Sequence, residues 1–282
     1  MDQSEFEWHE LAYKRTTTDA ELQPFLEELK AADFLCVGGD GFVDERILKL
    51  CPNVKIVSVN GVGYDGVDVA AVTAAGVFLA NAPVLREACA DMALLLMLAA
   101  MRKAAAGYRL TQAAGPPSGW DWGAMRKIVG DDPTGKTLGL IGFGRIGQTF
   151  AAKAQAAFGM KILYYDKIKK PPVRTGGGSD AGGRPGATGE FVLSEPYHQL
   201  KHPPIWVTLD ELLATSDVVS MHASLNSASR GMMGPAEFSK MKKSAYFVNM
   251  SRGGLVQEEA LADALAAGRE FLPLCYASRS YP

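Results

Sequence analysis

The 282-residue sequence lacks several features that mark particular classes of protein. Its 4 cysteines lie far apart and none has CxxC spacing, so we expect an intracellular chain with reduced thiols. The longest apolar run, Met92 to Met101, is too short to span a bilayer and predicts a buried helix. No charge of one sign dominates, because 29 Lys and Arg stand against 31 Asp and Glu, so composition does not favour a nucleic-acid-binding surface.

The sequence also lacks a visible signal peptide and a convincing set of metal ligands. The first residues, MDQSEFEWHE, are acidic and contain no apolar stretch, so no signal peptide is visible and we expect a cytoplasmic protein without a membrane partner. His198 and His202 have HxxxH spacing, but three prolines crowd them and no acidic third ligand is indicated. We therefore expect no metal site.

The sequence does contain regular alternation of strand and helix patterns. In the first hundred residues, ADFLCVGG, VKIVSVNG and VFLAN read as strands, and DERILKLC and VDVAAVTAAG read as helices between them. This alternation predicts a parallel sheet with helices on its faces. A long helix is expected from Arg86 to Tyr108, and the Gly- and Pro-rich stretch AAGPPSGWDWG that follows predicts a domain boundary.

A second α/β unit begins at KTLGLIGFGRIGQTFAAKAQAAFGMKILYYDK, which reads as strand, glycine turn, helix closed by Gly159, and strand. DVVSMHA and AYFVNMS predict further strands, and PAEFSKM and QEEALADALAAG predict helices. One segment, KKPPVRTGGGSDAGGRPGATGE, is dominated by Gly and Pro and contains too little apolar surface to order itself. We expect a flexible surface insertion over residues 169–204.

The glycine turn has the pattern of a dinucleotide-binding site. Gly142, Gly144 and Gly147 stand in GxGxxG spacing between a strand and a helix, and Asp166 ends the next strand, 19 residues after Gly147. The glycines permit a tight turn, a close approach to the pyrophosphate, and close packing of helix on strand. A carboxylate at Asp166 accepts hydrogen bonds from ribose hydroxyls and repels a 2′-phosphate, so the pattern favours NAD over NADP.

These segments together resemble the D-isomer-specific 2-hydroxyacid dehydrogenases, a family that includes glyoxylate/hydroxypyruvate reductases, phosphoglycerate dehydrogenases and CtBP-type corepressors. The resemblance covers about residues 31–269 outside the insertion, and is carried by NGVGYDGVDVAAVTAAGV, GKTLGLIGFGRIGQ, FGMKILYYD, SDVVSMHASL and VNMSRGGLVQEEALADAL. It implies a smaller flavodoxin-like substrate domain with a linking helix over residues 1–108, and a Rossmann-type doubly wound NAD-binding domain over residues 109–282. It also implies an NAD-dependent oxidoreductase of D-2-hydroxy acids and 2-keto acids.

The resemblance also assigns roles to particular residues. The backbone amides at Val62 and Gly63 would hold the substrate carboxylate, and Arg252 would pair with that carboxylate and polarise the 2-keto oxygen. His222 matches a position that is not the proton donor, and we expect a packed, hydrogen-bonded histidine there. The remaining positions that would contact the cofactor are Arg145, Ile146, Ala223, Ser229, Met250 and Ser251.

The pattern of the family stops after the helix QEEALADALAAG. Family members continue with segments of the type AGAGLDVFE and PHIGG, which supply an acidic residue and the histidine that acts as general acid. Here REFLPLCYASRSYP stands at residues 269–282, without a histidine. The sequence therefore predicts domains that are incomplete at the C-terminal end, and at most a trace of activity.

Two alternatives to an active dehydrogenase remain. The scaffold could serve a non-catalytic NAD-binding regulatory protein, because the proton donor of the family has no counterpart. A CtBP-like binding partner is the other alternative, although no basic tail or peptide-groove pattern favours it. For an enzyme, the expected partner is a small 2-keto or 2-hydroxy acid, and a full-length relative would form a homodimer.

Overall fold

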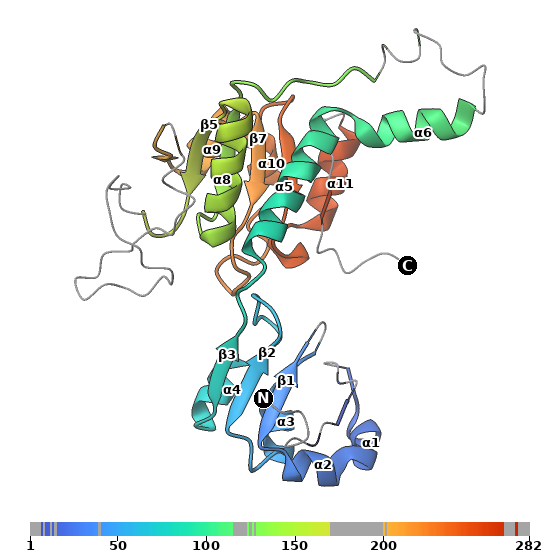
Figure 1. The fold of residues 1–282 in the computed structure, drawn as a ribbon, viewed down its shortest axis with the longest axis vertical. Helices are drawn as coiled ribbons and strands as arrows, with labels where there is room; N and C mark the ends of the chain where they lie inside the picture. The colour runs from blue at the N-terminus through green and yellow to red at the C-terminus, as the bar shows by residue number, and fades with distance from the viewer. Residues whose placement is uncertain are drawn as a thin grey trace. The chain divides into compact units, whose positions relative to one another are not determined.

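The computed structural model describes the chain in two compact units, Met1–Leu85 and Arg86–Pro282, each built from a parallel sheet and helices (Figure 1). The predicted α/β class is confirmed. Most of the predicted insertion lies outside the described residues. Within the described part, no helix is long and apolar enough to cross a membrane. The residues described are 7, 9–11, 13, 16–38, 41–114, 123, 126, 128–169, 200, 202–267 and 274–275.

The first unit contains the three predicted strands in the order β1-β2-β3, all parallel: β1 (Phe34–Val37), β2 (Ile56–Val59) and β3 (Phe78–Asn81). Its helices are α1 (Asp19–Leu22), η2 (Gln23–Phe25), α2 (Leu26–Ala31), α3 (Glu45–Leu50) and α4 (Val69–Ala74). The predicted helices correspond to α3 and α4. Asp44 and Asp68 are the N-caps of these two helices, and each carboxylate accepts a hydrogen bond from a backbone N–H of the first turn.

The core of the first unit lies on one face of its sheet. Val37, Val57 and Val59 point to this face and cluster with the buried side chains of the helices. Phe34 and Phe78 point to the opposite face and remain 56% and 75% exposed. Among the described residues, the predicted covering of the sheet by helices therefore holds for one face.

The second unit is a doubly wound sheet with strand order β6-β5-β4-β7-β8-β9 and parallel pairing throughout. Its strands are β4 (Thr137–Ile141), β5 (Lys161–Tyr165), β6 (Ile205–Trp206), β7 (Val218–Met221), β8 (Tyr246–Asn249) and β9 (Leu274–Cys275). Its helices are α5 (Arg86–Met101), α6 (Ala104–Ala114), α8 (Arg145–Phe158), α9 (Leu209–Thr215), α10 (Pro235–Lys240), η4 (Gly253–Leu255) and α11 (Glu258–Ala266).

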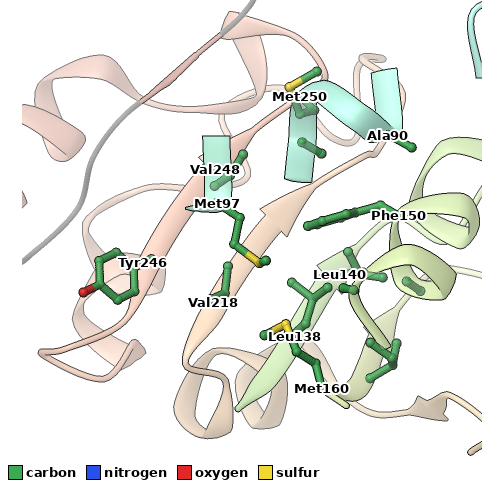
Figure 2. Close-up of a cluster of buried hydrophobic side chains, with 14 of the residues drawn as sticks. Ala90, Met97, Leu138, Leu140, Phe150, Met160, Val218, Tyr246, Val248 and Met250 are labelled. Atoms are coloured by element: carbon green, nitrogen blue, oxygen red, sulfur yellow. The ribbon is translucent and has the colours of Figure 1, made fainter. Parts of the chain in front are cut away.

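Helices cover both faces of this second sheet. On one face, α5 and α8 bury Met97 and Phe150 against Leu140, Val218 and Val248, as Figure 2 shows. On the other face, α9, α10 and α11 pack against alternate residues of the same strands (Figure 1). Strands β7 and β8 are buried along their whole length, as central strands of parallel sheets are.

The prediction of one long helix from Arg86 to Tyr108 was wrong, because this segment forms two helices, α5 and α6. The break lies at Arg102 and Lys103, where Lys103 has a left-handed φ of 51°. The main chain at Gly130 passes so close to the Met101 carbonyl that a side chain would not fit there, and the Asp131 N–H donates to that carbonyl at 2.8 Å. A segment distant in sequence therefore ends the helix, and α5 packs within the second unit.

Asp217 joins the starts of three central strands. Its carboxylate accepts hydrogen bonds from the Thr137 N–H at 2.9 Å and from the Lys242 ammonium at 2.8 Å. Its own carbonyl accepts from the Tyr246 N–H at 2.9 Å. Burial by itself would raise the pKa of Asp217, but Lys242 and the Thr137 N–H hold that pKa below its ordinary value.

This arrangement predicts a pH-dependent contribution to stability. Asp217→Asn should lower the free energy of unfolding at pH 7 by about 1–2 kcal/mol, since two charge-assisted hydrogen bonds are weakened. Because the folded-state pKa is depressed, the parent chain should lose this advantage as the pH falls below about 4. Urea unfolding at several pH values measures the difference between the two proteins.

Asp210→Asn is the matched control. Asp210 pairs with Lys240 on the surface, where its side chain is 68% exposed, so its loss should cost about 0.5 kcal/mol or less. A difference between parent and Asp217→Asn that stays constant from pH 7 to pH 3 would contradict the role assigned to the carboxylate.

Candidate functional site

The sequence-predicted cofactor positions of the second unit meet at one edge of its sheet. Gly142 follows β4, Asp166 follows β5, and Ala223 lies just beyond β7. Strand β4 pairs with β5 on one side and with β7 on the other, so the chain crosses to opposite faces at this point. Open α/β sheets bind their ligands outside the carboxyl ends of the strands at such a switch point.

Gly142 brings the turn into contact with the end of β7. Its φ is +89°, a left-handed conformation that favours glycine. A Cβ atom at this position would lie 2.6 Å from the backbone nitrogen of Ala223. The Gly142 N–H donates to the Tyr165 carbonyl at 2.8 Å, which ties the turn to β5 as well.

The other two glycines differ in what surrounds them. At Gly147 a Cβ atom would lie 2.8 Å from the Gly142 carbonyl oxygen and 3.5 Å from the Cβ of His222, so glycine lets α8 pack closely on the turn. At Gly144 a Cβ atom would meet nothing within 4 Å. Gly142 and Gly147 are therefore required by the protein itself, whereas Gly144 borders open space.

That open space lies at the start of α8. Gly144 is the N-cap of this helix and has no side chain to occupy the space or to cap the first turn. The positive end of the helix dipole is directed there, as in sites that bind phosphate groups. Arg145 is exposed and Ile146 is half-buried beside it. The glycines and the helix start thus fit a dinucleotide pyrophosphate.

Asp166 lies beside the same turn. Its Oδ2 accepts a hydrogen bond from the Phe143 N–H at 3.0 Å, and its carbonyl accepts one from the Trp206 indole N–H at 3.2 Å. The carboxylate is half-buried, and the Lys169 ammonium lies 5.7 Å from the centre of the Trp206 ring. Asp166 is therefore held against the glycine turn, where the ribose of a dinucleotide would bind.

His222 is packed beneath the turn. Its Nε2 lies 2.9 Å from the Ser220 Oγ, and its ring centre lies 5.7 Å from that of Phe150. Burial lowers the pKa of His222 from 6.5 to about 3, so the imidazole is neutral near pH 7. This geometry agrees with the expected packed, hydrogen-bonded histidine.

The loop after β7 is stabilised by its own polar groups. Ser229 is buried, and its hydroxyl donates to the Ser224 carbonyl at 2.7 Å and accepts from the Asn226 N–H at 2.9 Å. Ala223 is half-buried at the start of this loop. The sequence places Ser229 at the cofactor; in the structure its hydroxyl shapes the loop.

Arg252 lies in the turn that follows β8. It is half-buried, and its Nη1 donates to the Ser251 carbonyl at 3.1 Å. Burial raises the pKa of Cys89 in α5, and the positive charge of Arg252 opposes that rise. Met250 differs from its neighbours, because its side chain packs into the core against α5 (Figure 2).

Val62 and Gly63 belong to the first unit. They lie in the turn after β2, where the Asn81 side chain donates to the Val62 carbonyl at 2.8 Å. The Val62 residue is 37% exposed. This turn is again at the carboxyl end of a parallel strand. Within the described part of the chain, no cluster of three His, Cys, Asp or Glu side chains is arranged to hold a metal ion.

Comparison with known families identifies the second unit. The sequence model for the NAD binding domain of D-isomer specific 2-hydroxyacid dehydrogenases matches residues 94–179 and 190–271. Among curated proteins, a glyoxylate reductase of Thermococcus litoralis is 34% identical over 247 residues, which are 86% of this chain and 66% of the relative. The chain thus spans slightly less than two thirds of that relative's length.

Solved structures show the same likeness. A glyoxylate reductase from Paecilomyes thermophila superposes with a TM-score of 0.71 at 31% identity, over 91% of this chain and 72% of that one. A D-lactate dehydrogenase from Aquifex aeolicus, solved with NAD and lactic acid, gives a TM-score of 0.69 at 26% identity, over 86% of this chain and 64% of that one.

The contrast between Gly142 and Gly144 predicts two different mutant phenotypes. Gly142→Ala should lower the free energy of unfolding by about 3 kcal/mol or more, because it adds strain and a backbone clash. Gly144→Ala should cost at most about 1 kcal/mol as a poorer N-cap, yet should abolish stabilisation by NADH. Thermal unfolding with and without NADH separates the two effects; the parent should gain about 2.7 kcal/mol at 100 times its Kd.

Gly38→Ala in the first unit is the control, since a Cβ atom there also meets nothing within 4 Å. It should leave both the unfolding temperature and the effect of NADH unchanged. Full stabilisation of Gly144→Ala by NADH would show that the pyrophosphate does not approach this glycine.

Proposed function

Because the chain belongs to the D-isomer specific 2-hydroxyacid dehydrogenase family, we propose that it takes part in hydride transfer between NAD and C2 of a small 2-hydroxy or 2-keto acid. The cofactor is NAD, in keeping with the family's NAD-binding domain. The observation that carries the proposal is the glycine turn, in which two glycines are closed in by protein and the third faces open space at a helix start.

The residues around the turn would hold the cofactor by complementary charge. Gly144, Arg145, Ile146 and Gly147 begin α8 and direct its positive end toward the pyrophosphate. Asp166 would accept hydrogen bonds from the adenosine ribose, while its contact with the Phe143 N–H keeps the carboxylate in place. When held there, the nicotinamide would supply or accept the hydride.

The substrate would be held by its carboxylate. We assign Arg252 to this carboxylate and to the 2-keto oxygen, because a planar guanidinium donates two parallel hydrogen bonds and stabilises the charge that develops on the oxygen. We also assign the backbone amides at Val62 and Gly63 to the substrate carboxylate. Ala223, Met250 and Ser251 would contribute the walls of the cofactor site at the ends of β7 and β8.

Protonation of the alkoxide needs a general acid, and His222, the described histidine at this edge of the sheet, does not suit that role. His222 is half-buried, and burial of its ring lowers its pKa to about 3, so it is neutral near pH 7 and a poor general acid there. We therefore propose that the 282 residues by themselves bind NADH and a 2-keto acid but reduce the acid only in trace amounts. The second candidate function, a non-catalytic NAD-binding protein, rests on the same observation.

We also propose a cellular location, an oligomeric state and a partner for this activity. Free thiols at Cys36, Cys51 and Cys89 are typical of reducing compartments and support a cytoplasmic location. For a full-length relative we propose a homodimer, because twofold dimers are the commonest symmetric assemblies of soluble proteins. The partner is a small 2-keto or 2-hydroxy acid, of the kind that the name of the Thermococcus litoralis glyoxylate reductase indicates.

Cofactor preference gives a direct test of Asp166. The parent should bind NADH more tightly than NADPH, and Asp166→Asn should reduce the ratio of the two affinities by about 10-fold, or about 1.4 kcal/mol. Asparagine keeps an oxygen for the Phe143 N–H and removes only the negative charge. Fluorescence of Trp206, whose indole is hydrogen-bonded to Asp166, follows both titrations. Equal affinities in the parent would contradict the assignment, and Asp210→Asn is the control for charge alone.

Catalytic capacity is tested by steady-state kinetics with NADH and glyoxylate. The 282-residue chain should turn over at least about 100-fold more slowly than the ordinary range of about 1–10³ s⁻¹, since general acid catalysis contributes about 10²- to 10⁴-fold. A kcat within the ordinary range would mean that another group donates the proton, and His222→Gln would then test the nearest candidate. Saturable NADH binding with no detectable turnover would favour the non-catalytic alternative.

A further inference from the structure

Asn249 is a buried polar residue at the end of β8, and both atoms of its amide are used. The residue is only 2% exposed. Its Oδ1 accepts a hydrogen bond from the Ser251 N–H at 3.0 Å, and its Nδ2 donates to the Arg252 carbonyl at 3.0 Å. One side chain therefore holds the backbone on both sides of the peptide that joins Ser251 to Arg252.

The turn is fixed from its other end as well. The Arg252 carbonyl also accepts from the Leu255 N–H at 3.3 Å, and Leu255 is fully buried in the core. Arg252 itself has an extended backbone, with φ −136° and ψ 144°, before η4 begins. The backbone of Arg252 is thus held by two anchors, the Asn249 amide and the buried Leu255, and its Nη1 donates to the carbonyl of the neighbouring Ser251 at 3.1 Å.

We infer that Asn249 is a positioning residue for Arg252: its amide sets the orientation in which the guanidinium meets the substrate carboxylate. The inference rests on the proposed function, which gives Arg252 that task. Binding of a carboxylate by a bidentate guanidinium depends on orientation, so a small rotation of the turn loses one of the two hydrogen bonds.

The chemistry of the amide explains why aspartate does not replace it. A carboxylate at position 249 keeps an acceptor for the Ser251 N–H but has no donor for the Arg252 carbonyl. It also places a negative charge in the same turn, three residues before Arg252, and that charge competes with the substrate carboxylate for the guanidinium. Asn249→Asp preserves the shape of the side chain while it removes the positioning contact.

The test is a double-mutant cycle of Asn249→Asp and Arg252→Ala in the 282-residue chain. Each protein is saturated with NADH and titrated with oxamate, an unreactive carboxylate analogue of a 2-keto acid. We expect Asn249→Asp to raise the oxamate Kd at least 10-fold, to leave the NADH Kd within 2-fold of the parent, and to have no further effect once Arg252 is alanine. Asn249→Ser should have the same effect, because the serine hydroxyl is too short to reach both the Ser251 N–H and the Arg252 carbonyl. This variant takes the place of Asn249→Asp if the aspartate variant does not fold.

Asn53→Asp is the matched control. The Asn53 side chain also donates to a backbone carbonyl, that of Lys30 at 2.8 Å, but it lies in the first unit and away from Arg252 in sequence. The same loss of a donor and gain of a charge should there leave the oxamate Kd unchanged.

The outcomes separate the inference from the function on which it rests. If Arg252→Ala leaves the oxamate Kd unchanged, or the parent binds no oxamate, the role of Arg252 is wrong and the inference falls with it. If Arg252→Ala weakens oxamate binding while Asn249→Asp does not, the function stands and the positioning role is overturned. An effect of Asn249→Asp that persists in the Arg252→Ala background, or that extends to NADH, would show that Asn249 acts through the fold as a whole.

Discussion

The contact between the glycine turn and the end of β7 is the constraint on which the site depends. Gly142 brings its backbone so near to Ala223 that any side chain would separate β4 from β7 at their carboxyl ends. Because the same turn is bonded to Tyr165 on β5, one residue sets the spacing of three neighbouring strands. The position of α8 follows, since Gly147 lets its first turn pack against the Gly142 carbonyl. Gly144 lies between these two closely packed glycines and is the one of the three that borders open space.

The polar residues at this edge of the sheet stabilise the protein and also define the site. Asp166 uses one carboxylate oxygen to hold the Phe143 N–H, and this contact keeps its charge near the turn. Ser229 bonds its hydroxyl within its own loop. Buried polar groups require such partners, because an unpaired group costs about 1–3 kcal/mol. Each contact with the backbone therefore also restricts where a ligand group can be placed.

The sequence could predict the features that depend on local spacing. The three glycines, the acid after β5 and the helix closed by Gly159 all occur within one strand–helix–strand unit, and the structure has them where the pattern indicates. The break at Lys103 could not be predicted, because its cause is the main chain near Gly130, 27 residues later.

Helix α9 could have been found from Thr208 and Glu211, because a threonine followed three residues later by a glutamate is typical of a helix N-terminus. Asn249 gave only a weak signal, since an asparagine at the end of an apolar strand is also typical of a simple turn.

The ends of β7 and β8 show a common physical logic. Both strands are buried, so their first polar side chains cannot reach water and must find partners in the residues that follow. Ser220 contacts the ring of His222, and Asn249 accepts from the Ser251 N–H, in each case two residues further along. The two loops leave the same edge, because Met221 and Asn249 are paired in register. A neutral His222 beside one loop adds no charge there, so the charges held at this edge are the Asp166 carboxylate, the Arg252 guanidinium and the positive end of the α8 dipole. The satisfaction of buried polar groups thus determines which charges the site presents and in what direction.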